Sequence, residues 1–515
     1  MKRESFYITT AIHYANAAPH IGHAYENICA DVMARFKRLD GYDVYFLTGM
    51  DEHGQKVQQK AKENKIDSQK YVDSISDTFR VMNRNLNLSN DDFIRTTENR
   101  HKRAAQLFWK KLEEKGDIYL GKYEGWYSIR DEAFYSENEV TISEDGKRIA
   151  IDSKTEVEWM VEESYFFRLS AYTDRLLKLY EVRPDMIQPA SRRNEVINFV
   201  KQGLHDLSIS RTSFTWGIPV LGNDRHVMYV WVDALINYLS ALDYPERNAP
   251  LYNRFWPCDV HLVGKDIVRF HAIYWPAFLI SAEIPLPRVI HGHGHILNNG
   301  EKMSKSLGNV ISPQDLINKY GSDATRYVLM REITFGQDGN ISDESAVIRI
   351  NSELANTIGN LVQRTLCLIY KNCKGLIPNC NTLQKVDYDL LNTCDETLLG
   401  KLRKHSEIMQ FNRAIGEIVQ LAVAANAYID EQAPWTLKKT DYYRMETVLY
   451  VLAEIIRQLG IALQPYTPVA SGRILDQLGI AETQRNFSFL SRDYALKSGL
   501  PILEPEGVFP RINFA

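Results

Sequence analysis

Two histidines and a glycine lie where an apolar run gives way to a predicted helix. His20 and His23 enclose Gly22 in the stretch NAAPHIGHAYENICAD, which follows FYITTAI. A helix N-terminus presents free backbone N–H groups and the positive end of the helix dipole, and both favour phosphate. Gly22 lets a ligand approach the backbone, and imidazole N–H groups can stabilise charge on phosphate oxygens in a transition state. The same four residues could instead cap the helix or bind a metal, so this motif alone does not decide the function.

Two lysines in a glycine-bounded stretch form a second candidate site. Lys302 and Lys305 lie in GEKMSKSLGN, which runs from Gly300 to Asn309. A loop of small polar residues that carries two ammonium groups can close over a triphosphate. The alternative is a basic turn that only contacts solvent.

The hydrophobic pattern predicts two β-α-β units that would position these motifs. The first has strands at 6–10 and 44–47 around an amphipathic helix at 22–39; the second has strands at 259–264 and 288–294 around a helix at 270–282. Such units form parallel sheets. Ligands bind beyond the carboxyl ends of the strands in these sheets, which is where His20 and His23 would lie.

The rest of the chain predicts an insertion and a helical end. Residues 116–226 are rich in Glu, Tyr and short alternating runs, and from about residue 340 apolar residues recur at helical spacing. We therefore expect an α/β fold with a doubly wound parallel, Rossmann-like sheet, split by an insertion domain and followed by an α-helical bundle. The expected divisions are 1–115 and 227–295 for the two halves of the catalytic domain, 116–226 for the insertion, 296–350 for the lysine-loop and stem-contact region, and 351–515 for the helical domain.

Composition narrows the class of protein. The chain has 515 residues and a formal net charge of −4, which argues against a wholly basic nucleic-acid coat protein. It has no secretory signal pattern and no apolar run long enough to cross a membrane. Its six cysteines are scattered without a Cys-x-x-Cys pair, which fits reduced thiols in a cytoplasmic protein.

The words His-Ile-Gly-His and Lys-Met-Ser-Lys-Ser together resemble the two signatures of class I aminoacyl-tRNA synthetases. In that family these residues stabilise the pyrophosphate leaving group during amino-acid adenylation. The resemblance implies catalytic roles for His20, His23, Lys302 and Lys305. The ATP-binding residues that it implies are Gly22, Glu26, Gly264, Asp266, Lys302, Lys305 and Arg211.

Four longer blocks resemble the methionyl-tRNA synthetases, of a bacterial short type without zinc knuckles. The blocks are TGMDEHGQKV, YVWVDALINYL, GKDIVRFHAIYWPAF and DEQAPWTLKK. A methionine thioether needs an apolar, partly aromatic pocket, and a carboxylate such as that of Asp51 would accept hydrogen bonds from the substrate ammonium. The implied methionine-binding residues are Ala11, Ile12, Tyr14, Asp51, Trp231, Ala234, Tyr238, Ile267 and His271. Without the resemblance, these aromatic residues would be interpreted as core.

The resemblance also implies an anticodon-binding site in the helical domain. Trp435 matches a tryptophan that stacks on an anticodon base, and stacking on unpaired bases is a common way to recognise RNA. Asn360 and Arg364 match the other anticodon-binding positions and lie four residues apart, on one helix face. A tryptophan at a helix start is otherwise most often part of the core.

The chain departs from this family at two places. Residues 101–250 contain no cysteine, so we expect no structural zinc, which such knuckles hold through thiolates. His291, His293 and His295 could share a strand face, but they lead directly into the lysine stretch and we predict no metal there. His13 stands where relatives are expected to carry Tyr or Pro, and the sequence does not explain it.

The predicted function is that of a methionine–tRNA ligase. It would use L-methionine, ATP and Mg²⁺ to make methionyl-adenylate and then charge the terminal adenosine of elongator and initiator tRNA(Met). We expect a cytoplasmic monomer without membrane contact. Three alternatives stay open: a class I synthetase for isoleucine, valine, leucine or cysteine, a small nucleotidylyltransferase with the histidine motif, and a non-catalytic RNA-binding relative.

Overall fold

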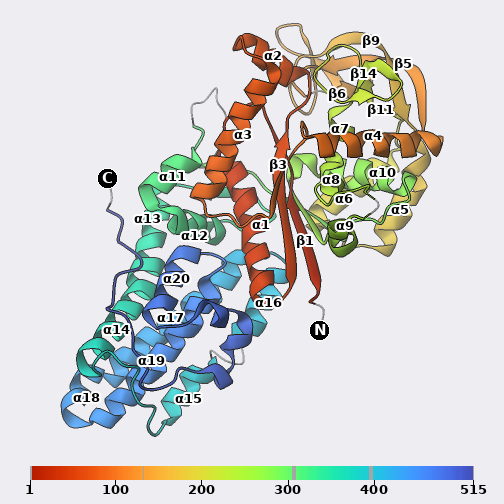
Figure 1. Ribbon diagram of the computed structural model, residues 1–515. Coiled ribbons are helices and arrows are strands. Elements are labelled where there is room, and N and C mark those ends of the chain that lie inside the picture. The colour runs from red at the N-terminus through yellow and green to blue at the C-terminus, as the bar shows by residue number, and fades with distance from the viewer. Residues whose placement is uncertain (1–2, 132, 247, 304–308, 394–397, 514–515) are drawn as a thin grey trace.

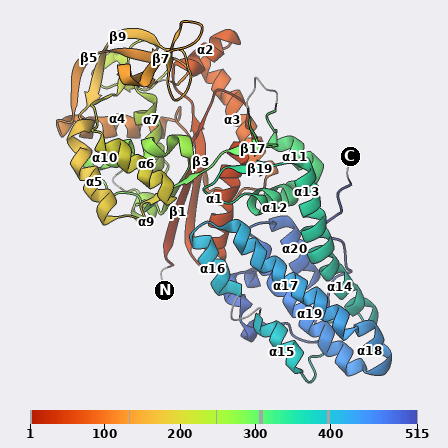
Figure 2. The same ribbon diagram turned by 180° about the vertical axis from the view of Figure 1, so that it is seen from behind.

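The computed structural model describes residues 3–131, 133–246, 248–303, 309–393 and 398–513. An α/β half, which contains the N-terminus, is joined to a long helical half (Figures 1 and 2). The helix α18 (Pro434–Thr440) lies at the end of the helical half that is farthest from the sheet. The predicted fold class, a parallel sheet followed by a helical bundle, is confirmed.

The main sheet is entirely parallel. Within the described residues it has seven strands in the order β10–β16–β15–β1–β3–β2, with β4 also paired to β3. Its strands are β1 (Ser5–Thr10), β2 (His13–Tyr14), β3 (Asp43–Asp51), β4 (Asp92–Arg95), β10 (Ile187–Gln188), β15 (Val260–Gly264) and β16 (Val289–His293). The chain order reverses beside β1, which lies between β3 and β15. This is the topological switch point at which such sheets bind ligands.

Helices cover both faces of this sheet. Alternate residues of β1 point to opposite faces: Phe6 and Ile8 pack with α1, whereas Tyr7 belongs to the cluster that contains α4 and α10. Figures 1 and 2 show α1 and α3 on one side of the sheet and α4, α7, α8 and α10 on the other. The helices of this half are α1 (Ile21–Leu39), α2 (Gln55–Glu63), α3 (Ser68–Asn85), α4 (Asn99–Glu114), α5 (Thr173–Val182), α6 (Ala190–Lys201), α7 (Val230–Leu235), α8 (Asn237–Ser240), α9 (Pro250–Phe255) and α10 (Trp275–Ser281).

The helix predicted at 270–282 is not regular. A π-helical turn, η4 (Phe270–Tyr274), precedes α10. Pro276 has no N–H to donate to the carbonyl of Ala272, and that carbonyl instead accepts a hydrogen bond from the Tyr180 hydroxyl at 2.6 Å. The π-helical turn therefore accompanies a proline, and the Tyr180 hydroxyl supplies the hydrogen bond that the proline cannot donate.

Small antiparallel sheets occupy much of the predicted insertion. β5 and β9 form its longest pairing, from Ile118 opposite Phe167 to Tyr127 opposite Glu158. The strands outside the main sheet are β5 (Ile118–Ser128), β6 (Ala133–Tyr135), β7 (Val140–Ile142), β8 (Arg148–Ala150), β9 (Glu158–Phe167), β11 (Leu207–Ser208), β12 (Ser210–Arg211), β13 (Pro219–Val220), β14 (Asn223–Met228), β17 (Ile296–Asn298), β18 (Glu301–Lys302) and β19 (Gly339–Ile341). The same stretch of chain also supplies β10 to the main sheet.

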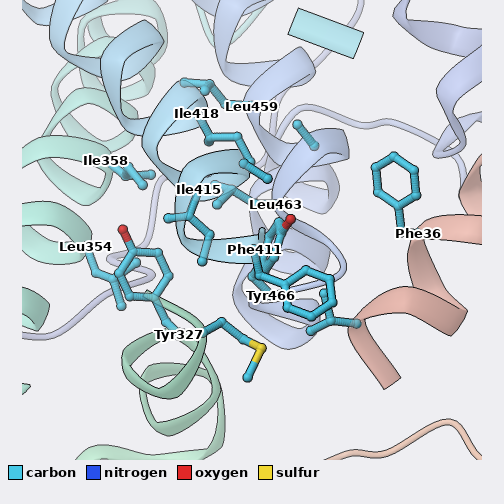
Figure 3. Packing of buried hydrophobic residues seen from close by; sticks show 14 of the residues in the cluster. Phe36, Tyr327, Leu354, Ile358, Phe411, Ile415, Ile418, Leu459, Leu463 and Tyr466 are labelled. Carbon is cyan, nitrogen blue, oxygen red and sulfur yellow. The ribbon is translucent and has the colours of Figure 1, made fainter. Parts of the chain in front are cut away.

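The helical half shares one continuous core with the α1 face of the sheet. Phe36 of α1 belongs to the same cluster of buried residues as Tyr466 and residues of α17 and α19 (Figure 3), and its ring meets Phe487 edge-on at 4.9 Å. The helices of this half are α11 (Pro313–Tyr320), α12 (Ser322–Glu332), α13 (Asp343–Arg349), α14 (Asn360–Asn372), α15 (Lys385–Asn392), α16 (Leu399–Glu407), α17 (Phe411–Gln432), α18, α19 (Tyr442–Leu463) and α20 (Pro468–Gln477), with π-helical η5 (Ile350–Gly359) before α14.

The α1 helix is more buried than an amphipathic pattern predicts, and Asp31 on its polar side finds a partner in a buried arginine. Asp31 is buried and lies 2.6 Å from Arg326 of α12. The Arg326 guanidinium also donates to the carbonyls of Leu86, Pro465 and Tyr466, at 3.1, 2.7 and 3.3 Å. Burial of a charge is costly unless it is paired and hydrogen-bonded. This arginine therefore ties α1 and the end of α3 to the turn between α19 and α20.

Removing one charge of this junction is expected to destabilise the fold strongly. Asp31→Asn leaves the buried Arg326 cation without its carboxylate, which should lower the free energy of unfolding by about 3–5 kcal/mol. The control is Glu114→Gln, which breaks an exposed pair with Lys110 at 3.7 Å and should cost at most about 1 kcal/mol. Denaturant unfolding checks both variants, and equal small changes would contradict the importance of the junction.

Candidate active site

A cavity of about 520 Å³ opens at the carboxyl edge of the main sheet. Segments that follow β1, β3, β15 and β16 form it together with the N-terminus of α1. Twelve of the predicted site residues line it: Ala11, Ile12, Tyr14, His20, Gly22, His23, Glu26, Asp51, Trp231, Gly264, Asp266 and Ile267. Residues predicted for ATP and for methionine thus meet in one space at the switch point.

The two histidines at the start of α1 form a reciprocal cap. His20 Nδ1 accepts a hydrogen bond from the Gly22 N–H at 3.1 Å, and His23 Nδ1 accepts one from the His20 N–H at 3.2 Å. Each Nδ1 therefore carries no proton, and the neutral rings carry theirs on Nε2. A Cβ on Gly22 would come within 2.9 Å of the His20 ring, so a glycine is needed to seat this cap. Capping and phosphate binding, treated as alternatives from sequence, are chemically compatible here.

His23 is held in its neutral form. Burial, together with the nearby imidazoles of His13 and His20, lowers the pKa of His23 well below its usual range. The rings of His20 and His23 stack at 3.7 Å, where two positive charges would repel. His13 packs behind, 4.7 Å from the His23 ring, and its Nε2 lies 2.9 Å from Asn27 Oδ1. His13 thus supports His23, a role that the sequence did not reveal.

Glu26 joins the two halves of the sheet at this point. Its Oε1 accepts the Ala11 N–H at 2.9 Å, at the end of β1, and its Oε2 lies 2.8 Å from His293 Nε2, at the end of β16. His293 Nδ1 lies 2.8 Å from the Gly294 carbonyl, which can only accept, so Nδ1 carries a proton. One buried carboxylate therefore fixes the α1 N-terminus to strands on both sides of the switch point.

The predicted methionine residues divide into a lining and a support. Ala234, Tyr238 and His271 do not line the cavity; the His271 ring meets the Trp231 ring edge-on at 5.9 Å. His271 Nδ1 donates to the Ile267 carbonyl at 2.9 Å, and burial lowers the pKa of His271 to about 4. Its Nε2 is then an acceptor for the Tyr238 hydroxyl at 2.6 Å. His271 therefore packs against Trp231 and is itself held by Tyr238.

The predicted ATP residues are less uniformly arranged. Asp266 and Gly264 line the cavity, and Asp266 Oδ2 lies 2.6 Å from His295 Nε2. Arg211 is buried outside the lining, with its guanidinium 4.5 Å from the Tyr229 ring and bonded to the Ser210 carbonyl at 2.7 Å. The backbone of Lys302 belongs to β18, and Lys305 lies outside the described residues.

Other lining residues were not predicted as ligands. They are His13, Lys56, Arg130, Asp131, Val230, His293, Gly294, His295, Ile296, Met303 and Val310. Lys56 stands within the block TGMDEHGQKV, so its sequence position was a usable signal. His293 and His295 were considered only as metal ligands, whereas in the structure they contact Glu26 and Asp266 and His291 packs against Phe335. Among the described residues, no three His, Cys, Asp or Glu side chains are grouped to hold a metal ion.

The three predicted RNA-contacting residues lie together at the far end of the helical half. The guanidinium of Arg364 lies 5.6 Å from the centre of the Trp435 ring and pairs with Asp430 at 2.7 Å. Asn360 is exposed one turn earlier on α14. Trp435 is 44% exposed, so the alternative interpretation of this tryptophan as core is wrong.

The part of the chain that the structure describes has no helix long and apolar enough to span a membrane.

Comparison with known proteins identifies the family. The model for class I tRNA synthetases (M) matches residues 6–145 and 145–366, and the model for the anticodon binding domain of methionyl tRNA ligase matches residues 377–514.

Full-length relatives agree with these two matches. Methionine–tRNA ligases of Rickettsia felis and Rhizobium meliloti are each 53% identical to this chain, over 99% and 98% of both sequences. A solved structure of Mycobacterium tuberculosis methionyl-tRNA synthetase in complex with methionyl-adenylate is 49% identical, covers 99% of this chain and 100% of its own, and superposes with a TM-score of 0.96. The chain therefore belongs to the methionyl-tRNA synthetases, within class I, and is a methionine–tRNA ligase.

Proposed function

We propose that the cavity at the start of α1 is where methionine and ATP react. The observation that carries this proposal is the reciprocal His20–His23 cap, which fixes two neutral imidazoles, each protonated on Nε2, at a helix N-terminus beside the switch point. The methionine-specific matches favour methionine over the other class I amino acids, and they do not fit a small nucleotidylyltransferase or a non-catalytic relative.

The amino-acid side of the cavity would be apolar with one carboxylate. Asp51, at the end of β3, would accept hydrogen bonds from the methionine ammonium. The thioether would contact Ala11, Ile12, Tyr14, Trp231 and Ile267, held from behind by Ala234, Tyr238 and His271. The relative from Mycobacterium tuberculosis binds methionyl-adenylate, and we propose the same intermediate here.

The phosphate side would use the cap and the lysines. Gly264 and Asp266 would contact the adenosine, and His20 and His23 would donate to the phosphates, with Lys302 and Lys305 closing over them. Gly22 and Glu26, which also line the cavity, would lie beside ATP and hold the cap and the strand ends in place. Arg211 would act from outside the lining, through its positive charge. Mg²⁺ is proposed to enter with ATP, because it is held mainly by phosphate oxygens and water in such sites.

The proposed reaction has two steps. A methionine carboxylate oxygen attacks the α-phosphorus of ATP, and the bond to pyrophosphate breaks as charge grows on its oxygens. The neutral imidazoles stabilise that charge by hydrogen bonds, so the protein contributes positioning and electrostatics. In the second step a hydroxyl of the terminal tRNA adenosine attacks the methionyl carbonyl, and AMP leaves.

We propose that residues 351–515 bind the anticodon of tRNA(Met). Trp435 would stack on a base, with Arg364 and Asn360 beside it. The remaining divisions, 1–115, 116–226, 227–295 and 296–350, are proposed as the split catalytic domain, its insertion and the link to the helical half. We also propose a cytoplasmic protein that is a monomer and holds no structural zinc. Gel filtration would test the monomer, and elemental analysis would test the absence of zinc.

Deleting one imidazole donor should slow the first step selectively. His23→Ala is expected to reduce ATP–pyrophosphate exchange by about a hundredfold or more, because one hydrogen bond to transition-state charge is lost. Methionine binding, measured by equilibrium titration, should change little, since this donor does not contact the amino acid.

Two further variants separate catalysis from helix capping. His23→Gln can still cap the helix and present an amide N–H, so it should lose less activity than His23→Ala. Ser342→Ala removes a similar capping box at α13 and should leave exchange unchanged. Near-normal exchange in His23→Ala would refute a role for His23 in catalysis.

Removing the exposed tryptophan should affect tRNA charging only. Trp435→Ala deletes a stacking surface worth about 1–3 kcal/mol per base, so aminoacylation should fall by about tenfold or more. Exchange without tRNA and the thermal midpoint should stay near wild type, because Trp435 is not core.

The matched control is Tyr388→Ala on α15, which is also 44% exposed but lies on a different helix. Its charging rate should remain normal. Normal charging by Trp435→Ala would contradict the anticodon role of this residue.

A further inference from the structure

A fully buried carboxylate lies between two histidines behind the active-site cavity. Asp233 of α7 has Oδ2 at 2.7 Å from His53 Nδ1 and Oδ1 at 2.7 Å from His101 Nε2. Asp233 and His101 are buried completely, and His53 nearly so. None of the three lines the cavity, and the proposed reaction uses none of them.

The protonation of this cluster follows from its partners. Burial by itself would raise the pKa of Asp233, but the charge and hydrogen bonds of His53 and His101 lower that pKa to about 2. An ionised carboxylate only accepts, so His53 Nδ1 and His101 Nε2 both carry protons that face it. Charge-assisted bonds of this kind are short and geometrically restrictive. Ser240 Oγ lies 2.9 Å from the other nitrogen of His101.

Each end of the cluster is two residues from a wall of the methionine pocket. His53 follows Asp51, the proposed ammonium acceptor, and Asp233 follows Trp231, the aromatic wall. Trp231 is itself stacked on Phe270, with ring centres 3.9 Å apart. The contact between His53 and Asp233 therefore links the segment that carries the Asp51 carboxylate to the helix that carries the Trp231 indole.

The segment that carries Asp51 is fixed on its other sides as well. The Glu52 carboxylate accepts from Arg95 Nε at 2.7 Å and from the hydroxyls of Ser76 and Thr97. The Glu52 carbonyl accepts the Trp216 indole N–H at 2.6 Å. The contact of His53 with Asp233 joins this segment to α7.

We propose that Asp233 is a positioning residue for the amino acid: through His53 and His101 it sets the distance between Asp51 and Trp231. This role rests on the proposed methionine site. It acts on the methionine side of the cavity and leaves the phosphate side, at the start of α1, unaffected. Loss of the carboxylate should therefore raise KM for methionine much more than KM for ATP.

The test compares Asp233→Asn with wild type in ATP–pyrophosphate exchange. The amide of the variant has one oxygen where the carboxylate has two, so it can accept a hydrogen bond from only one of the two histidines and carries no charge. The contact between the two segments should therefore loosen. Because Asp51 and Trp231 would no longer be held at the right distance, KM for methionine should rise about tenfold or more. KM for ATP should change less than about twofold. A titration of methionine followed by tryptophan fluorescence should show the same weakening without ATP.

Two comparisons separate positioning from general destabilisation. Asp387→Asn removes an equally buried carboxylate that pairs with Arg444 in the helical half, and it should lower thermal stability without raising KM for methionine. His53→Asn keeps a donor near the position of Nδ1 and should retain most of the affinity for methionine, whereas His53→Leu should lose it.

Each outcome has a distinct meaning. An unchanged KM for methionine in folded Asp233→Asn, or an equal rise in Asp387→Asn, overturns the positioning role alone. A wild-type protein that shows no methionine-dependent exchange overturns the proposed methionine site, and the positioning role with it.

Discussion

The proposed active site depends on one buried carboxylate, that of Glu26. It bonds the end of β1 through the Ala11 N–H and the end of β16 through His293. A doubly wound sheet necessarily has an opening where its strand order reverses, because neighbouring connections leave in opposite directions. Glu26 spans that opening from the first turns of α1. The histidine cap, one turn earlier, is thereby held at the edge of the cavity.

The same helix carries this constraint into the rest of the molecule. Along α1, His23 and Glu26 face the cavity, Asp31 meets Arg326, and Phe36 enters the core of the helical half (Figure 3). Because Glu26, Asp31 and Phe36 each contact a buried partner, α1 cannot move without disturbing both halves. A rigid helix suits chemistry that depends on prearranged hydrogen-bond donors rather than on a covalent intermediate.

Local patterns predicted much of this arrangement. The apolar spacing of Ile28, Val32 and Phe36 was enough to predict α1. The position of His20 and His23 after a strand predicted that they lie at the carboxyl edge of the sheet, where they line the cavity. The pattern did not predict that Asp31 would be buried, because Arg326 is distant in the sequence. It also assigned His293 no contact with Glu26. Such pairings depend on which surfaces the fold brings together, and a single sequence carries little information about them.

The central claim is that the cavity at the start of α1 activates methionine. ATP–pyrophosphate exchange, measured on wild-type protein with methionine, isoleucine, valine, leucine and cysteine in turn, tests it most directly. The apolar lining of Ala11, Ile12 and Trp231 with the carboxylate of Asp51 predicts rapid exchange with methionine and only trace exchange with the other four. Exchange that is as fast with one of the others, or that is absent with methionine, would contradict the account.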